Sequence, residues 1–314
     1  MTTTEQDPPE GDPQDQDSAS PFENGWLPIR EIARLTGVNA VTLRAWERRY
    51  GLIVPHRTPK GHRLYSNEHV DRVLTILTWL NRGVSVSQVK QLIDDQQAPA
   101  PSVESDWDIL RQTLQEAIGA LAERRLDDAL SRAMSLYPPR TLCEQLLLPL
   151  LAALEQRWQG QFGAQLERVF FYSWLRSKFG ARLYHNNRQV SGAPLLLINQ
   201  SDLPLEPHLW LTAWLLSSAD CPVEVFDWPL PSGELALACE YLKPRAVLLY
   251  SSKSLNVGQL PRLLHNIECP KLIVGPAVRI HATELSAAEG EVSGLYLAED
   301  PLTAQASLQQ LGLL

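Results

Sequence analysis

The chain has 314 residues, which predicts two or three domains, and its hydrophobic fraction of 44% allows a sizeable core. It has no apolar run of about 18 residues and no basic-then-apolar N-terminal segment, so we expect a cytoplasmic protein that does not enter a membrane. Its four cysteines are scattered without a C-x-x-C pair, which argues against a zinc site and indicates a reducing compartment.

The net charge of −8 is distributed unevenly along the chain. Residues 1–21 carry six acidic and no basic side chains, whereas residues 22–90 carry eleven Lys and Arg against five Asp and Glu. The rest of the chain is acidic again. One basic block between acidic segments is typical of a nucleic-acid-binding module joined to a module with another task.

Residues 1–24 are predicted to form a disordered acidic tail, because they offer almost no apolar surface to bury. A plain solvated tail is the favoured interpretation, and an arm that tunes nonspecific DNA binding is the alternative.

Residues 25–94 are predicted to form a small helical domain with one hairpin. The apolar spacing indicates a short helix from Ile29, a break at Thr36–Asn39, and a second helix over about 41–50. A stretch with two prolines and two glycines then predicts a hairpin or wing over 51–65. Two further helices are expected over 67–82 and 85–94.

The second helix carries the chemistry of a DNA-reading element. Leu43, Trp46 and Tyr50 share one apolar face, while arginines project from the rest of the helix. A helix that packs with one side and presents Arg and Thr from another is suited to the major groove. An ordinary amphipathic surface helix would show the same periodicity.

The hairpin decides between these interpretations. Arg57, Lys60, His62 and Arg63 place four potential cations within seven residues, which suits contacts to phosphates. The strings V-x-L-R-A-W-E-R-R-Y-G-L and P-x-R-T-x-x-G-H-R-L-Y together resemble the MerR family of regulators. Within that family their sequence is most similar to the MlrA/CarH-like branch.

The resemblance implies a winged helix-turn-helix in which the second helix enters the groove and the wing holds the flanking backbone. It implies a homodimer on double-stranded promoter DNA, with RNA polymerase as a partner, and activation by deforming the promoter. The DNA-contacting positions that we predict are Thr42, Arg44, Arg48, Tyr50, Arg57, Lys60, Gly61, His62, Arg63 and Tyr65.

The rest of the chain divides into three predicted segments. Residues 95–106 are a linker, and residues 107–190 have helical periodicity typical of a bundle. Residues 191–314 alternate apolar strand-like runs with helical segments, which predicts a Rossmann-like α/β domain with a parallel sheet. The strand-like runs are 194–199, 223–226, 246–250, 271–274 and 294–297, and the helical segments are 207–218, 232–242, 256–267 and 301–312. The fold class is therefore multidomain: a mainly α winged helix-turn-helix, a helical bundle, and an α/β domain.

A bundle followed by such a domain resembles the cobalamin-binding modules of CarH-type regulators and methionine synthases. That resemblance implies D/E-x-H-x-x-G after the first strand, with the His as cobalt ligand, S-x-L after the third strand and G-G after the fourth. Here Glu206 and His208 match, but Leu211 replaces the glycine. No S-x-L occurs around Ser252, and Pro276 follows Gly275.

The bundle departs from the resemblance as well. CarH-type modules have a Trp and a later Glu-His pair over the cobalamin, and here Trp158 is followed by Glu167 and then Arg168. Because close-approach glycines are lost, we expect a degenerate module without cofactor, with adenosylcobalamin or methylcobalamin as the alternative. The candidate ligand-site residues are Trp158, Glu167, His208, Ser252 and Gly275, and His208 would bind a metal only if cobalamin were present.

The sequence thus predicts a sequence-specific DNA-binding transcriptional regulator, an activator without enzyme activity, whose C-terminal domain serves sensing or oligomerisation. The alternative is a cobalamin-dependent, light-responsive repressor of the CarH type. A cobalamin methyltransferase subunit is disfavoured by the basic N-terminal domain, and the chain has none of the common nucleotide-binding or hydrolase motifs.

Overall fold

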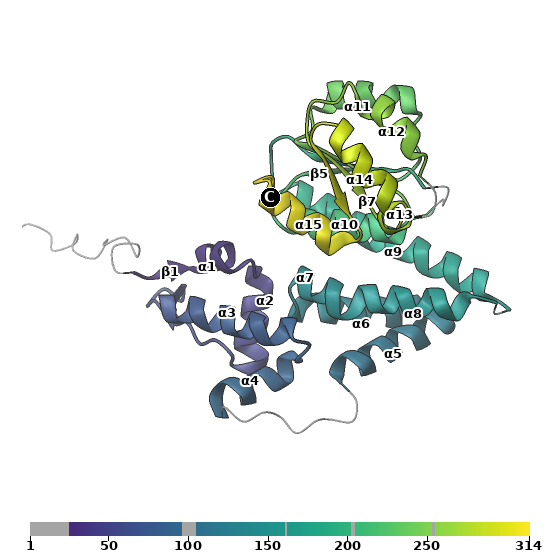
Figure 1. The fold of residues 1–314 in the computed structure, drawn as a ribbon. Helices are drawn as coiled ribbons and strands as arrows, with labels where there is room; N and C mark the ends of the chain where they lie inside the picture. The colour runs from purple at the N-terminus through teal and green to yellow at the C-terminus, as the bar shows by residue number, and fades with distance from the viewer. Residues whose placement is uncertain (1–24, 96–104, 161, 202–204, 253–254) are drawn as a thin grey trace, which may run out of the picture.

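The computed structural model describes residues 25–95, 105–160, 162–201, 205–252 and 255–314. The predicted acidic tail and most of the predicted linker lie outside these residues. In chain order the described residues form a helical part with a small sheet, a helical bundle, and a parallel sheet between helices (Figure 1). The predicted fold class is confirmed.

The first part contains four helices and three very short strands. Its helices are α1 (Ile29–Thr36), α2 (Ala40–Ala45), α3 (Asn67–Asn81) and α4 (Val86–Asp95), and α2 continues as a wider helical turn through Trp46–Tyr50. Its strands are β1 (Leu27–Pro28), β2 (His56–Arg57) and β3 (Arg63–Tyr65), paired antiparallel in the order β1-β3-β2. The predicted hairpin is therefore present, and β1 adds an edge strand that we did not predict.

Local signals set the ends of the first two helices. Gly37 adopts φ +69 at the end of α1, a conformation that favours glycine, and its N–H donates to the carbonyl oxygen of Ala33. Asn39 caps α2 by accepting a hydrogen bond from the backbone N–H of Thr42 at 2.8 Å. The two helices are thereby turned sharply against each other.

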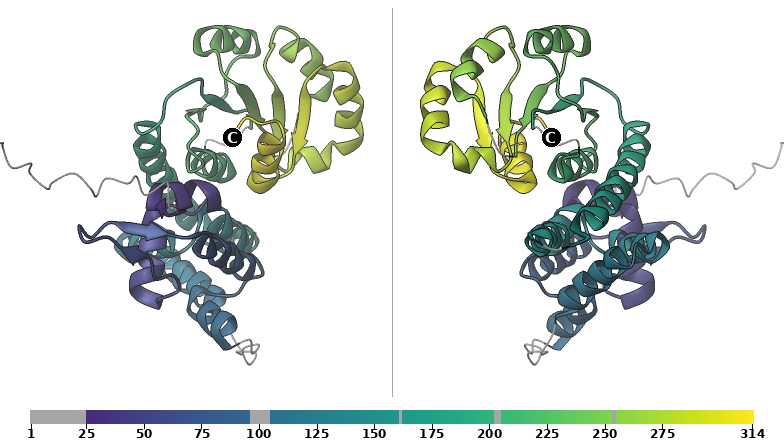
Figure 2. Two further views of the ribbon diagram at one scale, coloured as in Figure 1. Left: turned by 90° about the vertical axis from the view of Figure 1, so that its left-hand side faces the viewer. Right: turned by 90° about the vertical axis from the view of Figure 1, so that its right-hand side faces the viewer.

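The bundle is built from long helices that follow the predicted span. They are α5 (Asp106–Gly119), α6 (Glu123–Leu136), α7 (Pro139–Leu142), α8 (Leu148–Trp158) and α9 (Ala164–Asn187), with a wider turn over Cys143–Leu147 joining α7 to α8. Pro138 and Pro139 end α6 because proline cannot continue a helix. The long α9 runs out of the bundle and along α10 beside the sheet (Figure 2).

The third part is a five-stranded parallel sheet. Its strands are β4 (Leu195–Asn199), β5 (Val223–Phe226), β6 (Ala246–Tyr250), β7 (Lys271–Val274) and β8 (Leu295–Ala298), in the order β5-β4-β6-β7-β8. The strand order reverses between β4 and β6. In open α/β sheets the ligand crevice lies at the carboxyl ends of the strands on either side of such a reversal.

Helices cover both faces of this sheet. They are α10 (Pro207–Ser217), α11 (Leu235–Leu242), α12 (Leu260–Leu264), α13 (Ala277–Ile280), α14 (Ala282–Glu291) and α15 (Pro301–Gln310). Helices α10 and α15 share one hydrophobic core with the bundle, and α11, α12 and α14 form a second core on the other face. Every residue of α10 except His208 is buried, so this helix lies sandwiched between α9 and the sheet.

The three parts meet around the end of α6 and the start of α7. The indole N–H of Trp46 donates to the carbonyl oxygen of Leu136 at 2.7 Å, which fastens α2 to α6. The hydroxyl of Thr141 donates to the side chain of Asn81 at 2.9 Å. On the opposite side, Arg140 donates to the side chain of Gln305 in α15 at 3.0 Å.

Among the described helices, none combines the length and apolar character needed to cross a membrane.

Candidate DNA interface and cobalamin-type module

The exposed side of α2 and its continuation is basic. Leu43 and Trp46 are buried, while Arg44, Arg48 and Arg49 are exposed. Within the described residues these three guanidinium groups have neither a hydrogen-bond partner nor an ion-pair partner. The surface formed by these arginines is therefore free to bind an anionic partner.

Glu47 connects this basic surface to the wing. Its carboxylate accepts hydrogen bonds from Arg57 of β2 at 2.5 Å and from Arg63 of β3 at 2.6 Å. Partial burial raises the pKa of Glu47, but the hydrogen bonds from Arg63 and Arg57 outweigh this effect and hold the pKa below its usual value. The ionised carboxylate thus fixes the orientation of the hairpin relative to the helix.

The tip of the wing is a tight turn. The backbone N–H of Gly61 donates to the carbonyl oxygen of Thr58 at 2.8 Å, and Gly61 takes φ +82, where a side chain would be strained. The backbone N–H of His62 donates to the Thr58 hydroxyl at 3.0 Å. Lys60 and His62 are exposed at this tip.

Two of the side chains predicted to contact DNA are buried in this structure. The side chains of Thr42 and Tyr65 are 0% and 1% exposed, because Thr42 points into the core beneath α2 and Tyr65 packs edge-on against His69. Neither side chain reaches solvent. Tyr50 is half-buried, with part of its ring packed against the core.

The other predicted positions lie at the surface. Helix α2 and the wing bring together Arg44, Arg48, Arg57, Lys60, Gly61, His62 and Arg63, of which Arg63 is half-buried. The prediction left out Arg49, although its sequence position beside Arg48 made it a candidate, and it did not recognise Glu47 as the group that ties helix to wing. Only the spatial proximity of residues ten and sixteen positions apart shows that role.

In the third part, His208 lies at the start of α10, beside the carboxyl edge of the sheet. Its Nδ1 is 3.4 Å from Oε1 of Glu206, whose side chain is only 2% exposed. The His208 ring is stacked parallel to the ring of Tyr250, with an interplanar angle of 7° and centroids 6.4 Å apart. One face of the imidazole is therefore turned to a tyrosine of the chain itself.

Gly275 faces the same tyrosine. It takes φ +112, and a Cβ atom placed on it would lie 2.5 Å from the carbonyl oxygen of Ser251 and 2.9 Å from Cζ of Tyr250. The space beside this glycine is already filled by the Tyr250 ring, which is 1% exposed. Glycine is required here by its positive φ and by the close approach of the Ser251 carbonyl oxygen, and the Tyr250 ring lies beside it as well.

The two bundle residues predicted to lie over a ligand bind each other instead. The indole N–H of Trp158 donates to Oε2 of Glu167 at 3.0 Å, and Arg157 donates to the same oxygen. Partial burial raises the pKa of Glu167, and the hydrogen bonds from Trp158 and Arg157 reverse the shift and lower it. Trp158 is only 9% exposed and packs against Phe171 and Tyr172.

These residues do not fit cobalamin. The nucleotide-tail channel implied by the resemblance would pass the positions of Ser252 and Gly275, and Tyr250 occupies the space beside Gly275. Leu211, which replaces a close-approach glycine, is fully buried in α10. Buried atoms without a hydrogen-bond partner remain at Glu206 Oε2, Tyr250 Oη and Ser252 Oγ.

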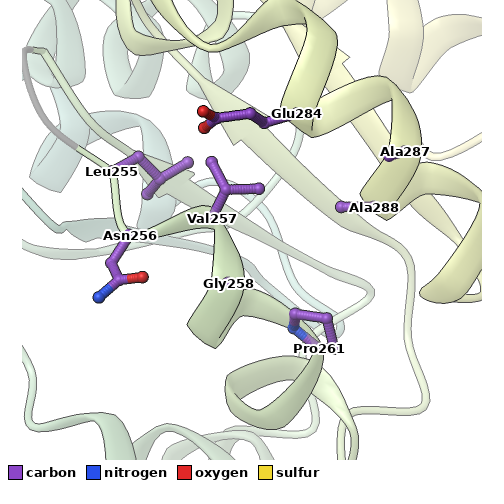
Figure 3. Close-up of a pocket in the computed structure, with 8 residues that line it drawn as sticks. All are labelled: Leu255, Asn256, Val257, Gly258, Pro261, Glu284, Ala287 and Ala288. Carbon is purple, nitrogen blue, oxygen red and sulfur yellow. The ribbon is translucent and has the colours of Figure 1, made fainter.

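An open hollow lies on the opposite face of the sheet from α10. It has a volume of about 650 Å³ between the segment after β6 and helix α14 (Figure 3). Its polar side chains are Asn256 and Glu284, and Glu284 is already paired with His281 at 3.1 Å. None of the predicted ligand-site residues lines it.

Comparison with known proteins agrees with this arrangement. Residues 27–96 match the family of MerR HTH regulatory proteins, and residues 110–183 match a B12 binding domain. The chain is 28% identical over 235 residues to the HTH-type transcriptional regulator MlrA of Escherichia coli K12, covering 75% of this chain and 92% of that protein.

Two further similarities cover less of the chain or are more distant. The chain is 30% identical over 145 residues to the HTH-type transcriptional repressor CarH of Myxococcus xanthus, covering 42% of this chain and 47% of that protein. A methanol:cobalamin methyltransferase complex from Methanosarcina barkeri aligns with 74% of this chain and 91% of its own, at 12% identity and a TM-score of 0.33.

The first matched segment contains the basic surface of α2 and the wing that Glu47 holds in place. The second matched segment lies in the helical bundle. The chain is a DNA-binding transcriptional regulator in which a segment similar to MerR HTH regulatory proteins is followed by a segment similar to a B12 binding domain.

Proposed function

We propose that the protein regulates transcription by binding double-stranded promoter DNA as a homodimer, with α2 in the major groove and the wing on the flanking backbone. The observation that carries this proposal is the set of three exposed, unpartnered arginines beside a wing that Glu47 holds in place. Arg44, exposed in the last turn of α2, is the side chain that we assign to a base edge. Lys60, at the tip of the turn, is positioned for a phosphate.

The proposed outcome of binding is activation through RNA polymerase. A MerR-type dimer that deforms the spacer between promoter elements stores several kcal/mol of DNA distortion, offset by contacts on both half-sites. The second module then serves oligomerisation or responds to a partner, without a catalytic step. Reporter transcription in the presence of purified polymerase distinguishes activation from repression.

The cofactor alternative is a cobalamin-dependent, light-responsive repressor like CarH. The Tyr250 ring beside Gly275 and the internal Trp158–Glu167 hydrogen bond weigh against it. A bound corrinoid would supply light-sensitive cobalt–carbon chemistry.

The test compares two alanine variants on DNA selected from the genome by the wild-type protein. Arg44→Ala is expected to lower specific affinity by about 5- to 150-fold, corresponding to about 1–3 kcal/mol, and to relax the preference at one base position. Lys60→Ala is expected to weaken binding to all sequences and to lower the salt slope by about one. Full sequence preference retained by Arg44→Ala would refute this placement of α2.

A further inference from the structure

Tyr250 lies where three elements of the cobalamin-type module converge. It is the last residue of β6, and its side chain faces the core shared with α10, α15 and the bundle. Its ring stacks on His208 from α10 and fills the space beside Gly275 after β7. One flat aromatic ring thus contacts two of the positions that the resemblance assigns to a bound cofactor.

The surroundings of the ring are closed and continuous with the bundle. Tyr250 is 1% exposed, and burial raises the pKa of its hydroxyl well above the usual value, with the nearby carboxylates of Glu206 and Glu155 adding to the shift. The Glu155 carboxylate accepts a hydrogen bond from Tyr172 of α9 at 3.4 Å. The tyrosine therefore lies in the core on the α10 side of the sheet, near enough to Glu155 of α8 and Tyr172 of α9 for their charges to act on its hydroxyl.

We propose that Tyr250 is a built-in occupant of the cofactor channel: its ring takes the place of a cobalamin tail, excludes corrinoids, and holds the sheet against the bundle without a ligand. This inference rests on the proposed function, in which the module acts without cobalamin. It adds the residue responsible and the consequence that DNA binding is independent of cobalamin and of light. The carboxylate of Glu206, with one buried oxygen unpartnered, remains as a remnant of the site.

The ring's role can be tested by deleting it and supplying it again as a free molecule. Tyr250→Ala leaves a buried cavity beside Gly275, and such apolar cavities bind small aromatic molecules. We expect the thermal midpoint of the full-length variant to fall by about 10 °C and to recover in part when p-cresol, the free equivalent of the side chain, is added. Tyr250→Phe keeps the ring and is expected to stay close to the wild-type midpoint.

Tyr241→Ala is the matched control, because Tyr241 is 79% exposed on α11 and its removal opens no cavity. It should shift the midpoint little and show no response to p-cresol. If Tyr250→Ala does not fold, Tyr250→Leu gives the same comparison with a smaller cavity. A folded Tyr250 variant whose midpoint p-cresol leaves unchanged would overturn the proposal.

The wild-type protein supplies the second measurement. After incubation with adenosylcobalamin or methylcobalamin and desalting, we expect no corrinoid absorption and a DNA dissociation constant unchanged by either compound or by illumination. Retention of a corrinoid band overturns the inference about Tyr250 and leaves the DNA-binding proposal standing. Absence of specific DNA binding defeats the proposed function but not the p-cresol result, so the two failures are distinguishable.

Discussion

The hydrogen bond between Trp46 and Leu136 is the most direct link between the DNA-binding helix and the bundle, and its removal should be costly. Trp46 is 0% exposed, and its indole N–H donates to the carbonyl oxygen of Leu136 at 2.7 Å. Trp46→Phe keeps most of the apolar ring and deletes only the donor and part of the volume. It therefore isolates the fastening of α2 to α6.

The expected loss of folding stability in Trp46→Phe has two contributions. Leu136 is 8% exposed, so its carbonyl oxygen would be left buried and unpaired, which costs about 1–3 kcal/mol. The smaller ring adds about 1 kcal/mol for lost packing. We therefore expect a decrease of about 2–4 kcal/mol in the free energy of unfolding.

Urea unfolding followed by circular dichroism measures this decrease. Trp228→Phe is the matched control, since Trp228 is 70% exposed and its substitution should stay within about 0.5 kcal/mol of wild type. If Trp46→Phe is as stable as Trp228→Phe, the hydrogen bond contributes nothing net and α2 is not held to the bundle in the way described.

Three further predictions concern the wing, the helix cap and the sheet edge. Because the pKa of Glu47 is lowered on folding, the stability that this carboxylate contributes is present above its unfolded pKa of about 4.3 and is lost as pH falls through the folded value. The stability difference between wild type and Glu47→Gln, measured by urea unfolding across pH 2–7, should accordingly be largest near neutrality and shrink in acid; a constant difference would contradict the ion pairs. Asn39→Ala removes the cap of α2 and should cost about 1 kcal/mol in the same assay, with Asn39→Ser close to wild type. Gly275→Ala should destabilise by more than about 2 kcal/mol because φ is +112 and Cβ would meet the Ser251 carbonyl, whereas Gly233→Ala, which meets nothing within 4 Å, should be nearly neutral.

Strands and long helices could be predicted from the sequence because their apolar periodicity is strong. The predicted runs over 223–226, 246–250 and 271–274 coincide with β5, β6 and β7. Helices α13 and α14 were missed, because residues 277–291 are rich in alanine and polar residues and show no clear apolar face. Propensity without a periodic pattern is a weak signal.

The candidate site was predictable in part. The exposed arginines followed from the composition of the second helix and its apolar stripe. The burial of Thr42 and Tyr65 did not, because neither the periodicity of a helix with a wider turn at Trp46–Tyr50 nor a three-residue strand such as β3 fixes which side chains meet the core. The position of the Tyr250 ring could not be predicted either. A continuously apolar strand has the same sequence pattern whether its last side chain fills ordinary core or a cofactor channel.

The meeting point at the end of α6 has a geometric consequence for operator choice. The α2 helix is hydrogen-bonded to α6 through Leu136, and α7 is hydrogen-bonded to α15 beside the sheet through Arg140, so the two contacts link α2 to the C-terminal part. In the proposed homodimer the separation and helical phase of the two half-sites would then follow from how the large C-terminal parts associate. Inserting five base pairs between the half-sites should abolish binding. Inserting ten base pairs, a full helical turn, should leave binding intact only if the link between α2 and the C-terminal part can bend.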